Sequence, residues 1–239
     1  MHPLALYDQL TARRTRFLRI DELCARGAEA APGLLPAQRE LEAEANLAQR
    51  DKKGLEKAQG EFLSRVLADP ACGTHLCHAM LLPRQESIAL LPKFEKTGQA
   101  DLNGAQLVRH GKASIVTMRN PRYLNAEDES TLDGMEMAVD LALLDPKTEV
   151  CVLRGGAVEH PKFAGRRLFG AGINLTHLYQ GKIRFLWYLI RDLGYVNKIY
   201  RGLADGVEKL WIAAVERYAI GGGCQLLHVM DHEIGRAHV

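Results

Sequence analysis

The chain has 239 residues, 47% of them hydrophobic and 25% charged, a composition typical of a globular protein with one large or two modest domains. Its formal net charge of +2 gives no electrostatic signature for nucleic acid or for an anionic membrane surface. No apolar run approaches the length of a membrane span, and no signal-peptide pattern follows Met1, so the cytoplasm is the expected location.

Residues 1–103 are predicted to form a helical N-terminal domain. The stretch 37–69 is rich in Ala, Leu, Glu, Lys, Gln and Arg, which are good helix formers. Apolar residues recur there at steps of three and four and so share one helix face: Leu55, Ala58, Phe62 and Val66. The charged residues between them are interpreted as a solvated face. Three prolines then punctuate the sequence: Pro70, Pro83 and Pro92.

From Gly104 the pattern changes to alternating strands and helices. Segments 106–110 and 113–118 are predicted strands, joined around Gly111-Lys112 in a short hairpin. A helix is expected over 126–144, where Asp145-Pro146 stops it. The run 149–153 is predicted to be a short buried strand.

The same alternation continues to residue 232. After a loop over 157–175, one helix is expected over 178–201, rich in Leu, Ile, Tyr and Trp. A strand over 209–215, a glycine triplet and a helix starting over 224–229 follow. Strands that alternate with helices favour parallel pairing, so we predict an α/β fold with its core over 104–232.

The last seven residues differ in character. Residues 233–239 read Glu-Ile-Gly-Arg-Ala-His-Val and resemble a translated sequencing adapter more than natural protein. We expect them to be a non-native tail, and we expect the natural chain to continue beyond His232.

The cysteines do not indicate a disulfide framework, because their number is odd and they are scattered: Cys24, Cys72, Cys77, Cys151 and Cys224. Cys72 and Cys77 lie near two histidines in the sequence, and such a group could bind zinc. The spacing is not that of a standard zinc finger, and no second ligand pair follows. Partly buried helix residues are the favoured interpretation, and no metal is expected.

Two glycine-rich segments carry the strongest functional signal. The first, 164–175, follows the predicted strand 149–153, and the second, 219–225, follows the predicted strand 209–215. Glycine lets backbone approach a ligand closely, so two such turns can aim two N–H groups at one point, as in an oxyanion hole. Stabilising an oxyanion suits acyl-thioester chemistry through an enolate. The alternative is that Gly221-Gly222-Gly223 only makes a tight strand-to-helix turn.

The pair resembles the crotonase, or enoyl-CoA hydratase/isomerase, superfamily. The matching motifs are Phe169-Gly170-Ala171-Gly172-Ile173-Asn174-Leu175 and Ala219-Ile220-Gly221-Gly222-Gly223-Cys224-Gln225-Leu226. The resemblance covers roughly residues 105–232, about half of the chain. It implies a crotonase-like core of ββα units, incomplete here, and trimers or hexamers when the chain is full length. It also implies that the backbone N–H groups of Ile173 and Gly222 are the oxyanion donors.

Gln225 discriminates among the reactions of this superfamily. Hydratases usually carry a glutamate there as acid and base, whereas glutamine only donates and accepts hydrogen bonds. Water addition by the usual route is therefore not expected. A core amide without a catalytic role is the alternative.

Two further segments, 120–127 and 160–167, and the helical N-terminal extension resemble one branch of the superfamily, the 3,5-dihydroxyphenylacetyl-CoA 1,2-dioxygenases of glycopeptide-antibiotic pathways. The resemblance implies oxidation of the aryl-acetyl thioester by O2 to the arylglyoxylate, with release of CoA and with no metal or organic cofactor. It also implies that Glu127 binds a ring hydroxyl, that Arg191 helps to hold the substrate and that Gln225 orients the reacting centre. Further predicted substrate contacts are His160, Ala171, Gly172, Asn174 and Gly223.

Each assignment has an alternative. Glu127 stands in the first turn of a predicted helix, where an acid stabilises the dipole in any case. Arg191 could be an exposed helix residue, and His160, which precedes a proline, could be structural. Three cations of the predicted long helix either contact CoA phosphates or line a solvated face: Lys182, Arg184 and Lys198. At the level of the protein, the alternatives are another crotonase-type reaction, such as isomerisation, hydration or thioester hydrolysis, and a non-catalytic scaffold.

Overall fold

The computed structural model describes residues 2–235 and divides the chain into two compact units, each discontinuous in sequence. Unit 1 comprises Met1–Leu82 and Thr176–Leu193, and unit 2 comprises Pro83–Leu175 and Gly194–Val239. The limit at Leu82 differs from the domain limit expected at residue 103, because the helix and the first strand that follow Pro83 pack within unit 2.

Unit 1 is helical, as predicted for the N-terminal region. Its elements are α1 (Pro3–Leu10), α2 (Ile20–Ala30), α3 (Gln38–Ala45), η1 (Gln49–Asp51), α4 (Glu56–Ala68), α5 (Pro70–Leu81), most of α8 (Leu175–Tyr179) and α9 (Trp187–Arg191). The predicted apolar face of α4 is buried at Phe62 and Val66. Helix α5 begins at a proline, and the Asp69 carboxylate caps it by accepting from the N–H of Cys72 (2.9 Å).

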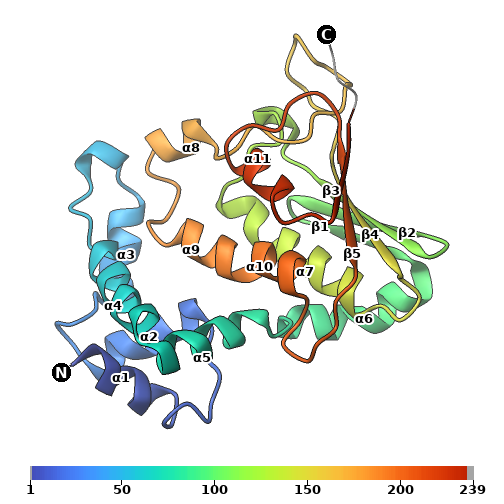
Figure 1. The fold of residues 1–239 in the computed structure, drawn as a ribbon. Coiled ribbons are helices and arrows are strands. Elements are labelled where there is room, and N and C mark those ends of the chain that lie inside the picture. Colours follow the sequence, from blue (N-terminus) through green and yellow to red (C-terminus); the bar gives the residue numbers. More distant parts are fainter. Residues whose placement is uncertain (1, 236–239) are drawn as a thin grey trace. The chain divides into compact units, whose positions relative to one another are not determined.

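Unit 2 is built on a six-stranded sheet in the order β1-β2-β3-β4-β5-β6 (Figure 1). The strands are β1 (Gln99–Leu102), β2 (Ala105–His110), β3 (Ala113–Met118), β4 (Val150–Gly155), β5 (Leu210–Val215) and β6 (His232–Gly235). The pairs β1–β2 and β2–β3 are antiparallel, and the pairs from β3 to β6 are parallel. The hairpin, the parallel pairing and the α/β class predicted from the sequence are confirmed.

Helix α7 (Glu129–Leu144) covers strands β1 to β3 and packs on α6 (Gln85–Thr97). It begins three residues later than predicted, because Asp128 is its cap and accepts from the N–H of Ser130 (2.9 Å). At its other end the buried Asp145 carboxylate accepts from the Arg109 guanidinium and from the Thr148 hydroxyl (both 2.6 Å). Both helix ends are therefore fixed by acidic side chains.

The prediction of a single helix over 178–201 is wrong. The chain instead forms α8, α9, the π-helical turn Asp192–Val196 and α10 (Asn197–Arg201). Gly181 has a left-handed φ of +73°, and its carbonyl accepts from the Lys52 ammonium (2.5 Å), so tertiary contacts end α8 there. Gly194 has φ −83° and ψ −115°, which no helix allows, and it breaks the run again.

Two strands were not predicted. Strand β1 pairs antiparallel with β2, and β6 pairs parallel with β5 although part of it falls in the expected non-native tail 233–239. Residues 236–239 of that tail lie outside the described residues. Within residues 2–235, no helix is both long and apolar enough to cross a membrane.

A buried ion cluster joins α7, α10 and the start of α6. The Lys198 ammonium lies 2.7 Å from Glu136 and 2.6 Å from Asp140, and all three side chains are 1% exposed or less. The second Asp140 oxygen accepts from the N–H of Arg84 and from the Ser87 hydroxyl (both 2.8 Å). Burial raises the pKa of Asp140, and the charge of Lys198 opposes that rise.

This cluster corrects the interpretation of Lys198 as a contact for CoA phosphates or as part of a solvated face, because its ammonium is buried against two carboxylates. Arg184 also has a carboxylate partner, Asp21 of α2, at 2.7 Å. Lys182 is exposed, as a solvated residue would be.

Replacing Lys198 by methionine should destabilise the protein strongly. Methionine keeps most of the volume but leaves two buried carboxylates without their cation, and breaking a buried pair in this way costs about 3–5 kcal/mol. Urea unfolding followed by circular dichroism measures the change. Lys182→Met is the matched control and should change the free energy of unfolding by less than about 0.5 kcal/mol. Equal midpoints for the two variants would contradict the assignment.

Candidate functional site

The two glycine-rich segments predicted to belong together lie against each other in unit 2. The N–H of Gly170 donates to the carbonyl of Tyr218 (3.0 Å), and the N–H of Ile220 donates to the carbonyl of Gly170 (2.9 Å). These bonds form a parallel bridge between Gly170 and Ala219. The segment after β4 is thus held by backbone bonds to the segment after β5. In Figure 1 the first segment leads into α8 and the second into α11 (Gly222–Leu227).

Glycine is required where these segments meet. A Cβ on Gly172 would stand 2.8 Å from the carbonyl oxygen of Ile220 and 3.2 Å from the nitrogen of Gly222. Gly172 also has a left-handed φ of +78°. A Cβ on Gly223 would stand 2.9 Å from the carbonyl oxygen of Gly170. The two segments therefore approach at a distance that only unsubstituted backbone allows.

Glu127 is joined to the first glycine segment through its backbone. Its N–H donates to the carbonyl of Gly172 (2.7 Å), and its carbonyl accepts from the N–H of Asn174 (2.8 Å). These two bonds bracket Ile173, to which Glu127 is bridged in parallel. In a parallel ladder the bracketed residue directs its own N–H to the opposite edge. The Ile173 N–H is thus turned away from Glu127. The residue that positions the Ile173 backbone, Glu127, is also one that the sequence analysis predicted to bind the substrate.

A network of asparagines around Asp128 supports this bridge. The buried Asp128 carboxylate accepts from the side-chain amides of Asn174 (2.8 Å) and Asn120 (3.0 Å). The amide of Asn125 donates to the carbonyls of Gly156 and Leu168 (both 2.8 Å). Asn125 has a left-handed φ of 55°, a conformation that asparagine tolerates better than most residues.

Sequence reasoning missed Asp128 and Asn125. A run of Asn, Asp and Pro before a helix signals a turn and a cap, which is the only sequence signal that they carry. Asn174 was predicted to contact substrate. Its buried bond to Asp128 makes it part of the framework, and its role toward substrate stays a prediction.

The side chain of Glu127 is buried, with 4% exposure, and the hydroxyl of Tyr195 donates to its Oε1. Tyr195 is 1% exposed and lies in the π-helical turn that follows the break in the expected long helix. Sequence reasoning also missed Tyr195, because a continuous helix would have given this residue a different direction. Glu127 comes just before the cap Asp128, so the interpretation that it merely occupies the first helical turn is wrong.

Gly222 and Gln225 lie on α11. Gly222 is the first residue of this helix and is buried, beside the position of Gly172 described above. Gln225 is exposed, so the interpretation as a core amide is wrong. Its backbone N–H donates to the carbonyl of Gly221 (2.9 Å), which places it one turn into the helix.

The remaining predicted residues are placed as follows. His160 is exposed on the loop after β4, and its ring lies 5.7 Å from that of Phe163, which in turn lies 5.8 Å from that of Tyr218 next to the second glycine segment. Ala171 is partly buried between Gly170 and Gly172. Arg191 ends α9 in unit 1 and is fully buried, so the interpretation as an exposed helix residue is wrong. It donates to Asp192 (2.7 Å), and its role toward the substrate stays a prediction.

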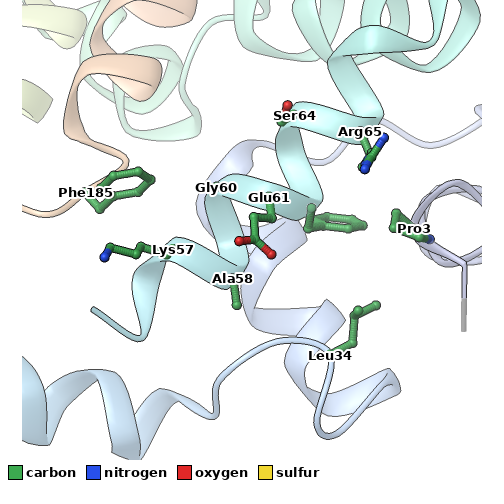
Figure 2. Close-up of a pocket in the computed structure, with 10 residues that line it drawn as sticks. Pro3, Leu34, Lys57, Ala58, Gly60, Glu61, Ser64, Arg65 and Phe185 are labelled. Carbon is green, nitrogen blue, oxygen red and sulfur yellow. The ribbon is translucent and has the colours of Figure 1, made fainter. Parts of the chain in front are cut away.

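No predicted site residue lines the cavity of unit 1 drawn in Figure 2, which has a volume of about 690 Å³.

Across residues 2–235, no group of three or more His, Cys, Asp or Glu side chains is arranged to hold a metal ion. Among the cysteines and histidines that were considered as zinc ligands and interpreted as helix residues, burial raises the pKa of the Cys72 thiol and lowers the pKa of His75. The Nδ1 of His75 lies 2.7 Å from the Tyr7 hydroxyl. Burial of Cys72 agrees with its interpretation as a helix residue.

Comparison with known proteins finds relatives in sequence, whereas no family model matches the chain. Over 241 residues it is 47% identical to the (3,5-dihydroxyphenyl)acetyl-CoA 1,2-dioxygenase of Amycolatopsis orientalis, a match that covers 98% of this chain and 56% of that protein. Over 139 residues it is 30% identical to the short-chain-enoyl-CoA hydratase of Clostridium acetobutylicum, covering 58% and 48%. A solved enoyl-CoA hydratase/isomerase from Xanthobacter autotrophicus Py2 aligns with 56% of this chain and 46% of its own, at 20% identity and a TM-score of 0.48.

These relatives confirm the resemblance to acyl-CoA enzymes of the crotonase type that the paired glycine segments predict. Within that class, the similarity to the dioxygenase extends over nearly the whole chain, including the helical N-terminal region, whereas the similarity to the hydratase covers little more than half. The chain spans about half the length of the curated relatives that it matches.

Replacing Gly172 by alanine should push the two glycine segments apart. The new methyl group would meet the backbone of Ile220 and Gly222, which cannot turn aside as a flexible side chain can. We expect the amide signals of 220–223 to shift in an NMR spectrum and the free energy of unfolding to fall by more than the roughly 1–2 kcal/mol that a left-handed alanine costs by itself.

Gly165→Ala is the matched control for this variant. Its φ is +71°, close to that of Gly172, yet nothing lies within 4 Å of the added Cβ. The difference between the two variants therefore measures the contact between the segments. Equal losses of stability and unchanged signals at 220–223 would show that no close approach exists.

Proposed function

We propose that the whole protein to which this chain belongs is a crotonase-superfamily enzyme that oxidises an aryl-acetyl-CoA with O2, without a metal or organic cofactor. The observation that carries the proposal is the junction of Gly172 and Ile173 with the turn at Gly222, bridged by Glu127. The 47% identity to a (3,5-dihydroxyphenyl)acetyl-CoA 1,2-dioxygenase supports the choice of substrate and reaction.

In this proposal the backbone N–H groups of Ile173 and Gly222 donate to the thioester oxygen. The α-proton of an aryl-acetyl thioester is acidic because the ring and the thioester both delocalise the carbanion, and two preorganised donors stabilise the enolate that forms. The electron-rich enolate passes an electron to O2. One thioester and one O2 then give one arylglyoxylate and one CoA thiol, and the two α-hydrogens end as protons on the new acid and the thiol.

The side chains have separate proposed tasks. Glu127 accepts a hydrogen bond from a ring hydroxyl, Arg191 holds the substrate, and Gln225 orients the reacting centre by hydrogen bonding without exchanging a proton. His160 contacts the substrate from the loop after β4. The remaining proposed substrate contacts belong to the two glycine segments: Ala171, Gly172, Asn174 and Gly223. A cytoplasmic trimer or hexamer that serves antibiotic biosynthesis completes the proposal.

A second candidate is another acyl-CoA reaction of the crotonase type, such as isomerisation, hydration or thioester hydrolysis. The 30% identity to an enoyl-CoA hydratase favours it, and such a reaction would use the same pair of oxyanion donors. Gln225 opposes hydration, because an amide cannot serve as the general acid and base that water addition requires.

The whole protein, supplied with 3,5-dihydroxyphenylacetyl-CoA, should consume O2 and release free thiol without added metal. An oxygen electrode measures the O2 consumed, and a thiol reagent measures the CoA released in the same turnover. Activity should persist after treatment with a chelator. No O2 uptake, or faster turnover of a simple enoyl-CoA than of the aryl-acetyl thioester, would reject the dioxygenase in favour of the second candidate.

Replacing Gly222 by alanine in the whole protein should lower kcat by a factor on the order of a hundred to a thousand, because a methyl group beside the thioester oxygen disturbs one oxyanion donor. Binding of CoA alone should change far less. Gly111→Ala, in the hairpin turn between β2 and β3, controls for the general cost of replacing a glycine, since nothing lies within 4 Å of its added Cβ. Near-normal turnover by Gly222→Ala would mean that the glycine triplet only makes a turn and supplies no oxyanion donor.

A further inference from the structure

We propose that Tyr195 is a positioning residue for Glu127: its phenol hydroxyl fixes the direction of the carboxylate that receives the ring hydroxyl of the substrate. This inference rests on the proposed function, because it assigns the orientation of one group at that site. Nothing in the sequence pattern points to Tyr195, which lay inside an expected continuous helix. The contacts on both sides of the residue carry the argument.

The first contact joins Tyr195 to Glu127. Both side chains are buried, with 1% and 4% exposure, and the tyrosine hydroxyl donates to Oε1 of the glutamate. Rotation about the last bond of a glutamate side chain is soft, so backbone position alone does not set the direction of its two oxygens. A fixed donor on one oxygen sets it. Because the backbone of Glu127 also brackets Ile173, this bond ties the carboxylate to the proposed oxyanion donor.

The second set of contacts fixes Tyr195 itself. Its neighbour Gly194 lies against the Glu136 carboxylate, whose oxygens would be 3.3–3.4 Å from an added Cβ. One helical turn beyond Tyr195, the Lys198 ammonium binds both Glu136 and Asp140. The same buried cluster on α7 therefore anchors the chain on each side of Tyr195.

These contacts form a continuous path from the ion cluster to the proposed site. Lys198 and Gly194 hold the π-helical turn, the turn aims the Tyr195 hydroxyl, and the hydroxyl aims the Glu127 carboxylate. The non-helical backbone at Gly194 interrupts the expected helix directly before Tyr195 and so changes the direction of the Tyr195 side chain. A side chain that is buried on a break of this kind is positioned by the break rather than by helix periodicity.

The test compares two thioesters that differ only in their ring hydroxyls, 3,5-dihydroxyphenylacetyl-CoA and phenylacetyl-CoA. Their dissociation constants are measured by calorimetry on the whole protein without O2, so that the result does not depend on turnover. Tyr195→Phe removes one hydroxyl. We expect it to weaken binding of the dihydroxy compound about tenfold, as for the loss of one hydrogen bond to a charged group, and to change binding of phenylacetyl-CoA less than twofold.

Tyr200→Phe is the matched control. This tyrosine lies on α10, is 64% exposed, and should show no change for either thioester. A purely structural role for Tyr195 would weaken both thioesters equally and would overturn the inference, as would no change at all. If the wild-type protein turns over neither compound but still discriminates between them through Tyr195, the reaction is wrong while the positioning role stands.

A double-variant cycle tests whether Tyr195 acts through Glu127. In a Glu127→Ala background the hydroxyl has no carboxylate to position, so Tyr195→Phe should have no further effect on the ratio of the two dissociation constants. Effects that multiply in the double variant would mean that the two residues act independently, and the inference would fail. Thermal unfolding of each variant identifies loss of folding, and the ratio between thioesters is then read on the variants that remain folded.

Discussion

The approach of two unsubstituted backbone segments, at Gly170–Gly172 and at Ile220–Gly223, is the constraint on which the candidate site depends. One segment follows β4 and the other follows β5, and parallel pairing of these strands brings both to the same end of the sheet. Their backbone bonds then fix the distance between the proposed donors at Ile173 and Gly222 more firmly than side chains could. A site made of main-chain groups also tolerates a change of chemistry, because its acids, bases and amides lie at other positions.

Buried polar side chains around this junction hold one another in place through hydrogen bonds and ion pairs. Asp128 both caps α7 and accepts from two asparagines, so the helix that covers the sheet and the loop that carries Glu127 share one residue. The ion cluster on the same helix holds Lys198 and, through it, the turn with Tyr195. Helix α7 is thus the common element of the network, and its buried acids Glu136 and Asp140 make contacts that hydrophobic burial would not specify.

Local signals made the hairpin, α7 and the paired glycine segments predictable, because turn residues, periodicity and caps act over a few positions. The break of the expected helix over 178–201 was not predictable in this way. Its causes are contacts from residues far earlier in the chain: the Lys52 ammonium on the Gly181 carbonyl and the Glu56 carboxylate on the N–H of Phe185 (2.6 Å). The bridge between Glu127 and Ile173 escaped prediction for the same reason, since neither residue type prefers that pairing.

The segment 176–193 completes unit 1 although more than ninety residues of unit 2 precede it in the chain. Its contacts with the N-terminal helices, such as Arg184 with Asp21 and Lys52 with Gly181, join residues more than a hundred positions apart. On the ribosome, the first 82 residues therefore emerge without the piece that packs on them, while β1 to β4 are already being made. Contacts between residues so far apart in the sequence slow folding. The helices of the first 82 residues therefore stay partly unpacked until segment 176–193 has been synthesised. During that time the nascent chain most needs protection from aggregation.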